Sequence, residues 1–178
     1  MKIAVIYRSK YGTTKQYAAW IAEALEAQLF ERRAVKAAQL TDFDMVIYGG
    51  GLYAGGIIGV GLVTKNPCKK LVLFTVGLAT PENTDYSEIL EKNIPSEMRK
   101  STKVFHLQGG IDYGKLGIVH KSMMAMIKRT VARKKALTND DKEFMATYGK
   151  KVNLTNQQSI MPLVEYCKAQ ACISGGGS

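Results

Sequence analysis

Residues 2–14, KIAVIYRSKYGTT, are the most informative segment of this chain, because an apolar run passes directly into a short loop rich in hydroxyl groups. Residues 3–7 are almost continuously apolar, which is typical of a strand buried on both faces of a parallel sheet. Helical periodicity begins behind the loop, at about Thr14. The sequence therefore predicts that the chain opens with a strand, a tight loop and a helix.

The loop between this strand and this helix is a candidate anion site. Backbone N–H groups at a helix start lack partners within the helix, and the helix dipole places positive charge there. The hydroxyl groups of Ser9, Thr13 and Thr14 can add hydrogen bonds to phosphate oxygens. The same residue types are common helix caps, so an ordinary capped loop is the alternative. The segment alone does not decide between the two.

The composition indicates one folded domain. With 178 residues, of which 46% are hydrophobic and 22% charged, the chain can bury a sizeable core. We expect a single domain over residues 1–173 and a flexible Gly/Ser tail over residues 174–178. No apolar run approaches the roughly 18 residues that span a bilayer. The first strand follows Met1 directly, so we expect a cytoplasmic protein.

The cysteine and histidine residues predict neither a disulfide framework nor a metal site. The spacing of the three cysteines matches no metal or redox motif, and in a reducing compartment they are expected to be packing residues. The two histidines are too few for a convincing metal centre. His106 falls in a predicted strand, where a structural role is expected.

Strand and helix patterns alternate along the rest of the chain. Further strands are predicted at residues 34–38, 45–48, 71–76 and 104–107, and helices at 14–31, 86–93, 116–135, 140–148 and 160–171. Alternating buried strands and helices predict an α/β fold with a doubly wound, five-stranded parallel sheet. Its expected strand order is 2-1-3-4-5, with helices on both faces.

Glycines follow most of the predicted strands. In an open parallel sheet the ligand binds beyond the carboxyl ends of the strands, where the strand order reverses. The loops after the first, third and fourth strands begin at Ser9, Gly49 and Gly77, and Gly109 follows the fifth. Glycine lets a backbone approach a flat ligand closely. Strands can also end in glycine for purely structural reasons, so the pattern favours a ligand edge without naming the ligand.

Two nucleotide motifs are rejected. No glycine pair is followed by the Lys-Ser or Lys-Thr of the P-loop pattern GxxxxGK[ST], so ATP or GTP chemistry is not expected. Residues 49–54, GGGLYA, satisfy the loose dinucleotide pattern GxGxxA. They follow the third strand, however, lead into no strong helix and have no acidic residue about 20 positions later. We interpret this match as fortuitous.

Residues 9–14, SKYGTT, resemble the phosphate loop of the flavodoxin family, whose usual form is a hydroxyl residue, any residue, Thr, Gly, a polar residue and Thr. The sequence departs from this pattern at Tyr11, which places an aromatic ring where Thr is usual. Strand spacing, the glycine-rich segment after the third strand and the length also match, so the resemblance covers most of the chain. It implies that FMN is the cofactor, with its phosphate held by Ser9, Lys10, Tyr11, Gly12, Thr13 and Thr14.

The same resemblance places the flavin ring between the loops after the third and fourth strands. Tyr53 is then expected to stack on the ring or against its edge, although a core tyrosine is the alternative. The fourth loop offers no aromatic residue before Tyr86, so Tyr113 is a candidate to cover the other face of the ring. The two sides of the ring would be lined by Leu52, Tyr53, Ala54 and Gly55, and by Gly77, Leu78 and Ala79.

The net charge of +10 differs from that of the familiar, strongly acidic flavodoxins. Positive charge is concentrated at residues 111–138, where seven Lys or Arg residues accompany one acid, Asp112. Apolar residues at helical spacing within 116–135 predict a basic amphipathic helix. Such a helix can lie on an anionic membrane or dock an acidic partner. It can equally be a core helix with a solvated basic face.

Residues 109–114, GGIDYG, precede this Met-rich basic helix, and the combination is similar to the flavodoxin-domain branch that includes menaquinone-dependent protoporphyrinogen dehydrogenase. That resemblance implies an FMN oxidoreductase that passes reducing equivalents from a small-molecule substrate to a quinone, with peripheral membrane contact through residues 116–135. No side-chain set stands out as a separate catalytic device, because the flavin carries the chemistry. A flavodoxin-type electron carrier that serves a redox partner protein is the alternative. Aromatic residues make up only 8%, so nucleic acid is not expected.

Overall fold

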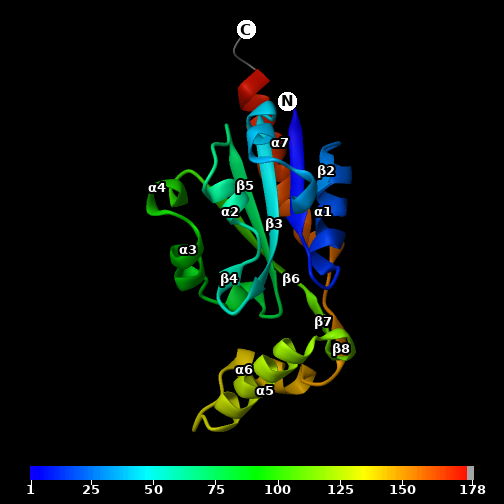
Figure 1. Ribbon diagram of the computed structural model, residues 1–178, viewed down its shortest axis with the longest axis vertical. Coiled ribbons are helices and arrows are strands. Elements are labelled where there is room, and N and C mark those ends of the chain that lie inside the picture. The colour runs from blue at the N-terminus through cyan, green and yellow to red at the C-terminus, as the bar shows by residue number, and fades with distance from the viewer. Residues whose placement is uncertain (176–178) are drawn as a thin grey trace.

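The strands of the central sheet are parallel and follow the order β2-β1-β3-β5-β6 (Figure 1). The computed structural model describes residues 1–175. A short strand, β4, pairs antiparallel with the end of β3. The fold class and strand order predicted from the sequence are therefore confirmed. The strands are β1 (Ile3–Arg8), β2 (Gln28–Glu31), β3 (Met45–Tyr53), β4 (Gly56–Ile57), β5 (Leu71–Gly77) and β6 (Lys103–Gln108).

Two apolar cores lie on the two faces of the sheet, because successive side chains of a strand point to opposite sides. Val5 and Ile47 belong to one core, and Ile6 and Tyr48, their neighbours in sequence, belong to the other. Helices cover both faces, as predicted. The first core includes residues of α1 (Thr13–Ala24) and α7 (Met161–Gly175), and the second is packed by η2 (Ala37–Asp42), α2 (Gly61–Thr64), α3 (Ser87–Asn93) and α4 (Ser96–Arg99).

The second strand does not lie at residues 34–38, where the sequence pattern predicts it. Helix α1 ends at Ala24, earlier than the predicted helix 14–31, and the chain turns at Glu26, whose φ is +50°. The strand β2 then occupies residues assigned to that helix. It is an edge strand, and Leu29 within it is 39% exposed. The prediction was wrong because an edge strand lacks the continuous apolar run that marks a buried one.

Strand β3 is longer than predicted and contains the glycines that the sequence analysis placed in a loop. Gly49, Gly50 and Gly51 continue the ladder and pair with β5 at Phe74, Thr75 and Val76. A Cβ atom on Gly49 would overlap the ring of Phe74. The absence of a side chain at Gly49 is therefore a packing requirement within the sheet.

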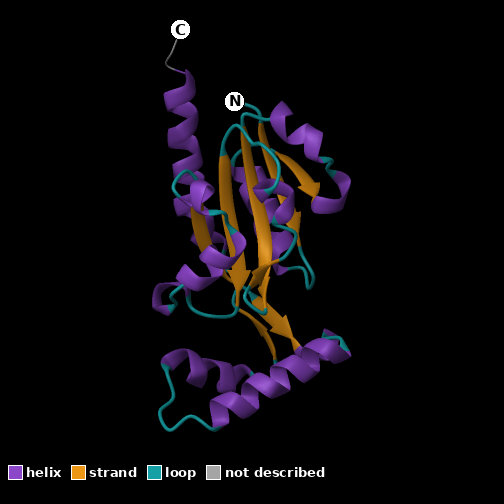
Figure 2. Ribbon diagram, turned by 60° about the vertical axis from the view of Figure 1, so that its left-hand side comes forward, coloured by secondary structure: helices purple, strands orange, loops and turns teal. Residues whose placement is uncertain are grey.

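A helical hairpin lies beyond the carboxyl ends of the strands (Figure 2). We call residues 118–147 the α5–α6 hairpin. The helices predicted at 116–135, 140–148 and 160–171 correspond to α5, α6 and α7. Helix α7 reaches Gly175, and residues 176–178 of the expected tail lie outside the described residues. The hairpin consists of α5 (Ile118–Ala132) and α6 (Asn139–Thr147), and it joins the sheet through the antiparallel strands β7 (Gly110–Asp112) and β8 (Lys151–Asn153).

Over residues 1–175, no helix is both long enough and apolar enough to cross a membrane.

Candidate functional site

The first loop leaves the start of helix α1 without a side-chain cap. Gly12 is the N-cap residue, and its φ of +98° is a conformation that favours glycine. Ser9 Oγ accepts a hydrogen bond from the Gly12 N–H at 3.0 Å, which braces the loop. Among the described side chains, none caps the first turn of the helix. The capped-loop alternative is therefore wrong, and the N–H groups of this turn are available to an anion.

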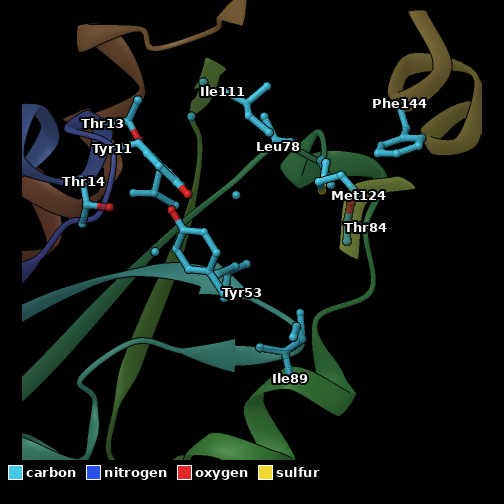
Figure 3. Close-up of a pocket in the computed structure, with 18 of the residues that line it drawn as sticks. Tyr11, Thr13, Thr14, Tyr53, Leu78, Thr84, Ile89, Ile111, Met124 and Phe144 are labelled. Carbon is cyan, nitrogen blue, oxygen red and sulfur yellow. The ribbon is translucent and has the colours of Figure 1, made fainter. Parts of the chain in front are cut away.

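A cleft of about 300 Å³ opens next to this helix start, at the carboxyl end of the sheet (Figure 3). The end of β3 with the turn after it forms one wall, and the end of β5 with the segment after it forms another. The structure thus brings together residues from three loops that lie far apart in the sequence. The predicted cofactor residues in its lining are Tyr11, Thr13, Thr14, Leu52, Tyr53, Ala54, Gly77, Leu78 and Ala79.

The remaining residues predicted for the first loop lie beside this cleft. Gly12 lines a neighbouring hollow of about 440 Å³, which shares Tyr11 and Thr13 with the cleft. Lys10 does not line either space. Its Nζ lies 5.9 Å from the ring centres of Tyr11 and Tyr53. The cleft and the hollow are contiguous, which gives a ligand with a ring and a phosphate room to extend toward α1.

Two tyrosine rings lie next to each other in the lining of the cleft. The ring centres of Tyr11 and Tyr53 are 6.1 Å apart, with their planes inclined at 54°. Their hydroxyl ends point toward one another (Figure 3). Burial, together with the neighbouring Tyr11, raises the pKa of Tyr53 to about 12, so this phenol keeps its proton at neutral pH. Tyr11, which departs from the family pattern, therefore contributes an aromatic wall to the cleft.

Tyr53 belongs to a tight hairpin that Asn93 fastens to helix α3. Ala54 and Gly55 form the two-residue turn between β3 and β4, with φ values of +48° and +72°. Asn93 Oδ1 accepts a hydrogen bond from the Ile57 N–H at 2.9 Å. Its Nδ2 donates to the carbonyl of Gly55 and to one in the preceding helical turn, both at 2.8 Å. Asn93 is therefore a positioning residue that the sequence analysis missed, because its partners are distant in sequence.

The opposite wall is held by a stacked pair of rings. Tyr86 lines the cleft, and its ring lies parallel to the imidazole of His106, with ring centres 3.6 Å apart and planes at 3°. His106 Nδ1 lies 2.6 Å from Thr75 Oγ1. Burial lowers the pKa of His106 to about 4, so the imidazole is neutral at pH 7. His106 lies in a strand, as predicted, and holds the segment after β5 in place.

The α5–α6 hairpin forms a third side of the cleft. Met124 and Ile127 of α5 and Phe144 of α6 line it, together with Leu116. The sequence analysis noted the amphipathic character of α5 but assigned the helix to a membrane surface, to an acidic partner or to the core. The periodicity indicated that one face of α5 is apolar, but it did not show that this face would line the cleft.

Tyr113, the residue predicted to cover the flavin, does not line this cleft. It packs in a small core beside the cleft with Met124, and its ring centre is 5.1 Å from that of Tyr148. Burial, with Tyr148 nearby, raises the pKa of Tyr113 to about 12. Tyr113 therefore packs against the α5–α6 hairpin and does not line the cleft.

Comparison with known proteins identifies the family of this chain. The family model described as flavodoxin domain matches residues 4–138, and the chain belongs to this family. No curated protein matches the chain. The sequence resemblance to flavodoxins is thereby confirmed, whereas the more specific branch is not.

Several solved flavodoxins and flavoproteins are similar in structure. A flavodoxin from the domain Archaea has 19% identity and a TM-score of 0.44, covering 61% of this chain and 83% of its own. Flavodoxin 2 from Bacillus cereus has 18% identity and a TM-score of 0.44, with coverage of 61% and 84%. A flavoprotein in complex with FMN from Lactobacillus acidophilus has 13% identity and a TM-score of 0.40, with coverage of 60% and 91%.

Proposed function

We propose that this protein is an FMN-dependent oxidoreductase. The observation that carries the proposal is the uncapped start of α1 at one end of an apolar cleft whose walls come from the loops after β3 and β5. An FMN phosphate suits the N–H groups of α1 and the hydroxyl groups of Thr13 and Thr14. The flat ring suits the space between Tyr53 and Leu78. The residues present therefore fit the cofactor that the family implies.

Bound FMN would supply the transfer of an electron pair and protons, which no side chain of the cleft provides alone. The chain's own residues would bind the phosphate, orient the ring between the two walls and exclude water. Tyr53 keeps its phenolic proton at neutral pH, so it adds no negative charge beside the ring. Asn93 and His106 act through other residues, by holding the two walls in position.

The position of the α5–α6 hairpin favours an enzyme over an electron carrier. A carrier must present its flavin edge to a protein partner, whereas here Met124, Ile127 and Phe144 line the cleft from the hairpin side. We propose a protoporphyrinogen dehydrogenase-like reaction with a quinone acceptor. In each turnover two electrons and two protons would leave the reduced substrate and convert the quinone to a hydroquinone. The apolar cleft and the basic surface of α5 support this choice.

Assays of the purified protein test this proposal. A flavin absorbance band that is released as FMN is expected, as is FMN-dependent quinone reduction with a porphyrinogen as the electron donor. A protein that holds a stable flavin semiquinone and reacts only with other redox proteins would instead be a carrier. Failure of the folded protein to bind added FMN would refute the cofactor assignment and both functions with it.

We also propose that the outer face of α5 contacts an anionic membrane surface. Ile118 is 85% exposed and Met126 is 65% exposed, and the basic residues Arg129 and Arg133 are exposed on the same helix or at its end. Val131, by contrast, is buried. Apolar side chains flanked by cations on one helix suit an interfacial position, in which acyl chains meet the apolar groups and lipid phosphates meet the cations.

A further inference from the structure

A third space, of about 560 Å³, lies between the α5–α6 hairpin and the carboxyl edge of the sheet. We call it the hairpin chamber. It shares Leu78, Ala79, Ile127 and Phe144 with the flavin cleft, so the two spaces are contiguous. A molecule in the chamber would lie next to the proposed site of the flavin ring, and it would not need to pass the start of α1, where the phosphate is proposed to bind. Residues that line the chamber and not the cleft include Gln108, Asp141, Ala146 and Leu154.

Polar side chains in the chamber lining already bond to the protein. Gln108 Nε2 donates to the carbonyl of Leu78 at 3.1 Å and to Thr80 Oγ1 at 3.3 Å. Thr147 Oγ1 donates to the carbonyl of Phe144 at 3.1 Å. Since Gln108 Nε2 and Thr147 Oγ1 already donate to protein groups, a ligand would gain its affinity chiefly from burying apolar surface against the aliphatic and aromatic side chains.

The charge at the chamber wall is also balanced internally. Lys134 Nζ lies 2.9 Å from each carboxylate oxygen of Asp141, and the Thr138 N–H donates to the same carboxylate at 3.0 Å. These contacts lower the pKa of Asp141, so the carboxylate stays ionised beside its ammonium partner. The Asp141 carboxylate is thus neutralised by Lys134, and the described lining includes no Lys or Arg that could pair with an anion in the chamber.

We propose that the hairpin chamber binds the second substrate of this oxidoreductase, the electron acceptor, and that this substrate is an uncharged, apolar, ring-sized molecule. The inference rests on the proposed function, because the substrate is assigned to the chamber through its contact with the flavin cleft. Ile127 and Phe144, which line both spaces, form the boundary across which the substrate approaches the ring site.

Two variants change the chamber without changing the cleft. Ala146→Trp fills the chamber from an exposed helical position, and Leu154→Asp adds a carboxylate at a position that is 39% exposed. Ala132→Trp is the matched control, because Ala132 is an exposed residue of α5 that is absent from the described lining of both spaces. Duroquinone is the probe, since it is uncharged and has no open ring position for the exposed Cys172 thiol to attack.

Calorimetric titration of duroquinone into flavin-free and FMN-loaded protein tests the inference, with FMN affinity measured separately. We expect duroquinone to bind about tenfold more weakly to both chamber variants, a loss of about 1.4 kcal/mol. Ala132→Trp should bind it as the native chain does, and FMN affinity should be unchanged in all three variants.

Unchanged duroquinone affinity in both chamber variants would overturn the inference, and so would equal affinity for anthraquinone sulfonate. Loss of FMN binding by the native chain would refute the proposed function. In that case, duroquinone binding to the flavin-free protein still tests the chamber. Failure of the proposed function and failure of the chamber inference can therefore be distinguished.

Discussion

Replacing Asn93 by Leu should loosen the wall of the cleft that carries Tyr53. The substitution removes the hydrogen bond to the Ile57 N–H and both bonds donated by Nδ2. Ile57 is only 4% exposed, so its N–H would be left buried without a partner at a cost of about 1–3 kcal/mol. The two donated bonds contribute about 0.5–1.5 kcal/mol each. We therefore expect the free energy of unfolding to fall by about 2–6 kcal/mol.

Urea unfolding followed by circular dichroism measures this loss, and a titration of FMN fluorescence measures the effect on the cleft. Asn93→Asp keeps the acceptor for the Ile57 N–H but sets a carboxylate oxygen against the two carbonyls that Nδ2 bonded, so it should destabilise the chain as well. Asn66→Leu, which removes a single bond to the Leu62 carbonyl, is the control, because neither residue is in the described lining of the cleft, and it should leave FMN affinity unchanged. The reasoning is refuted if Asn93→Leu loses less than about 1 kcal/mol or binds FMN as the native chain does.

The phosphate loop, His106 and the basic face of α5 each give a measurable outcome. Gly12→Val places a side chain at φ +98°, which costs about 1–2 kcal/mol of stability. We expect this variant and Thr14→Val to bind FMN about tenfold more weakly or worse, and unchanged affinity in a folded variant would count against the phosphate loop. The pKa of His106 is about 4 in the folded chain and about 6.5 when unfolded, so the unfolded state gains the proton first as pH falls. The His106 contribution to stability should therefore be complete above about pH 6.5 and fall by about 1–2 kcal/mol toward pH 4, discounted for the partial exposure of the ring. His106→Asn should remove the slope between about pH 6.5 and pH 5, above the range in which carboxylates such as Asp141 titrate, and an unchanged slope there in urea unfolding would argue against the assignment. Finally, Arg129→Glu combined with Arg133→Glu should lower binding to phosphatidylglycerol vesicles about tenfold or more in a sedimentation assay. Phosphatidylcholine vesicles, which carry no net charge, are the control. Equal binding of the double variant and the native chain to phosphatidylglycerol would exclude the membrane contact.

The sequence predicts the fold well where local pattern and burial agree. Strands β1, β3 and β5 are buried on both faces, so their apolar runs are nearly continuous and their order follows from the alternation with helices. The carboxyl ends of parallel strands share one edge, which is why Thr14, Tyr53 and Leu78 could be expected to meet. These predictions require no knowledge of individual side-chain contacts.

The features that the sequence could not predict depend on contacts between distant residues. Gly49 was expected to end a strand, but it pairs with β5 and lies within β3. The ring of Phe74 leaves no room for a side chain there, which explains why the residue is glycine. The stacking of Tyr86 on His106 and the bonds of Asn93 likewise join separate elements. Periodicity indicated that α5 has an apolar face, but it does not encode the direction in which a helix packs, and Met124 of this helix lines the cleft whereas Met126 is exposed. The hairpin side of the cleft was missed for that reason.

The binding of FMN and riboflavin to the flavin-free protein, measured side by side, tests the cofactor assignment most directly. The two ligands share the ring and differ in the phosphate, which the uncapped start of α1 and the hydroxyl groups of Thr13 and Thr14 are proposed to hold. Two or more hydrogen bonds to a charged group, at about 1.5–3 kcal/mol each, correspond to a preference of about 100-fold or more. We predict stoichiometric binding of FMN with at least this preference over riboflavin. Equal affinity for the two ligands, or no binding of either by the folded chain, would contradict the account.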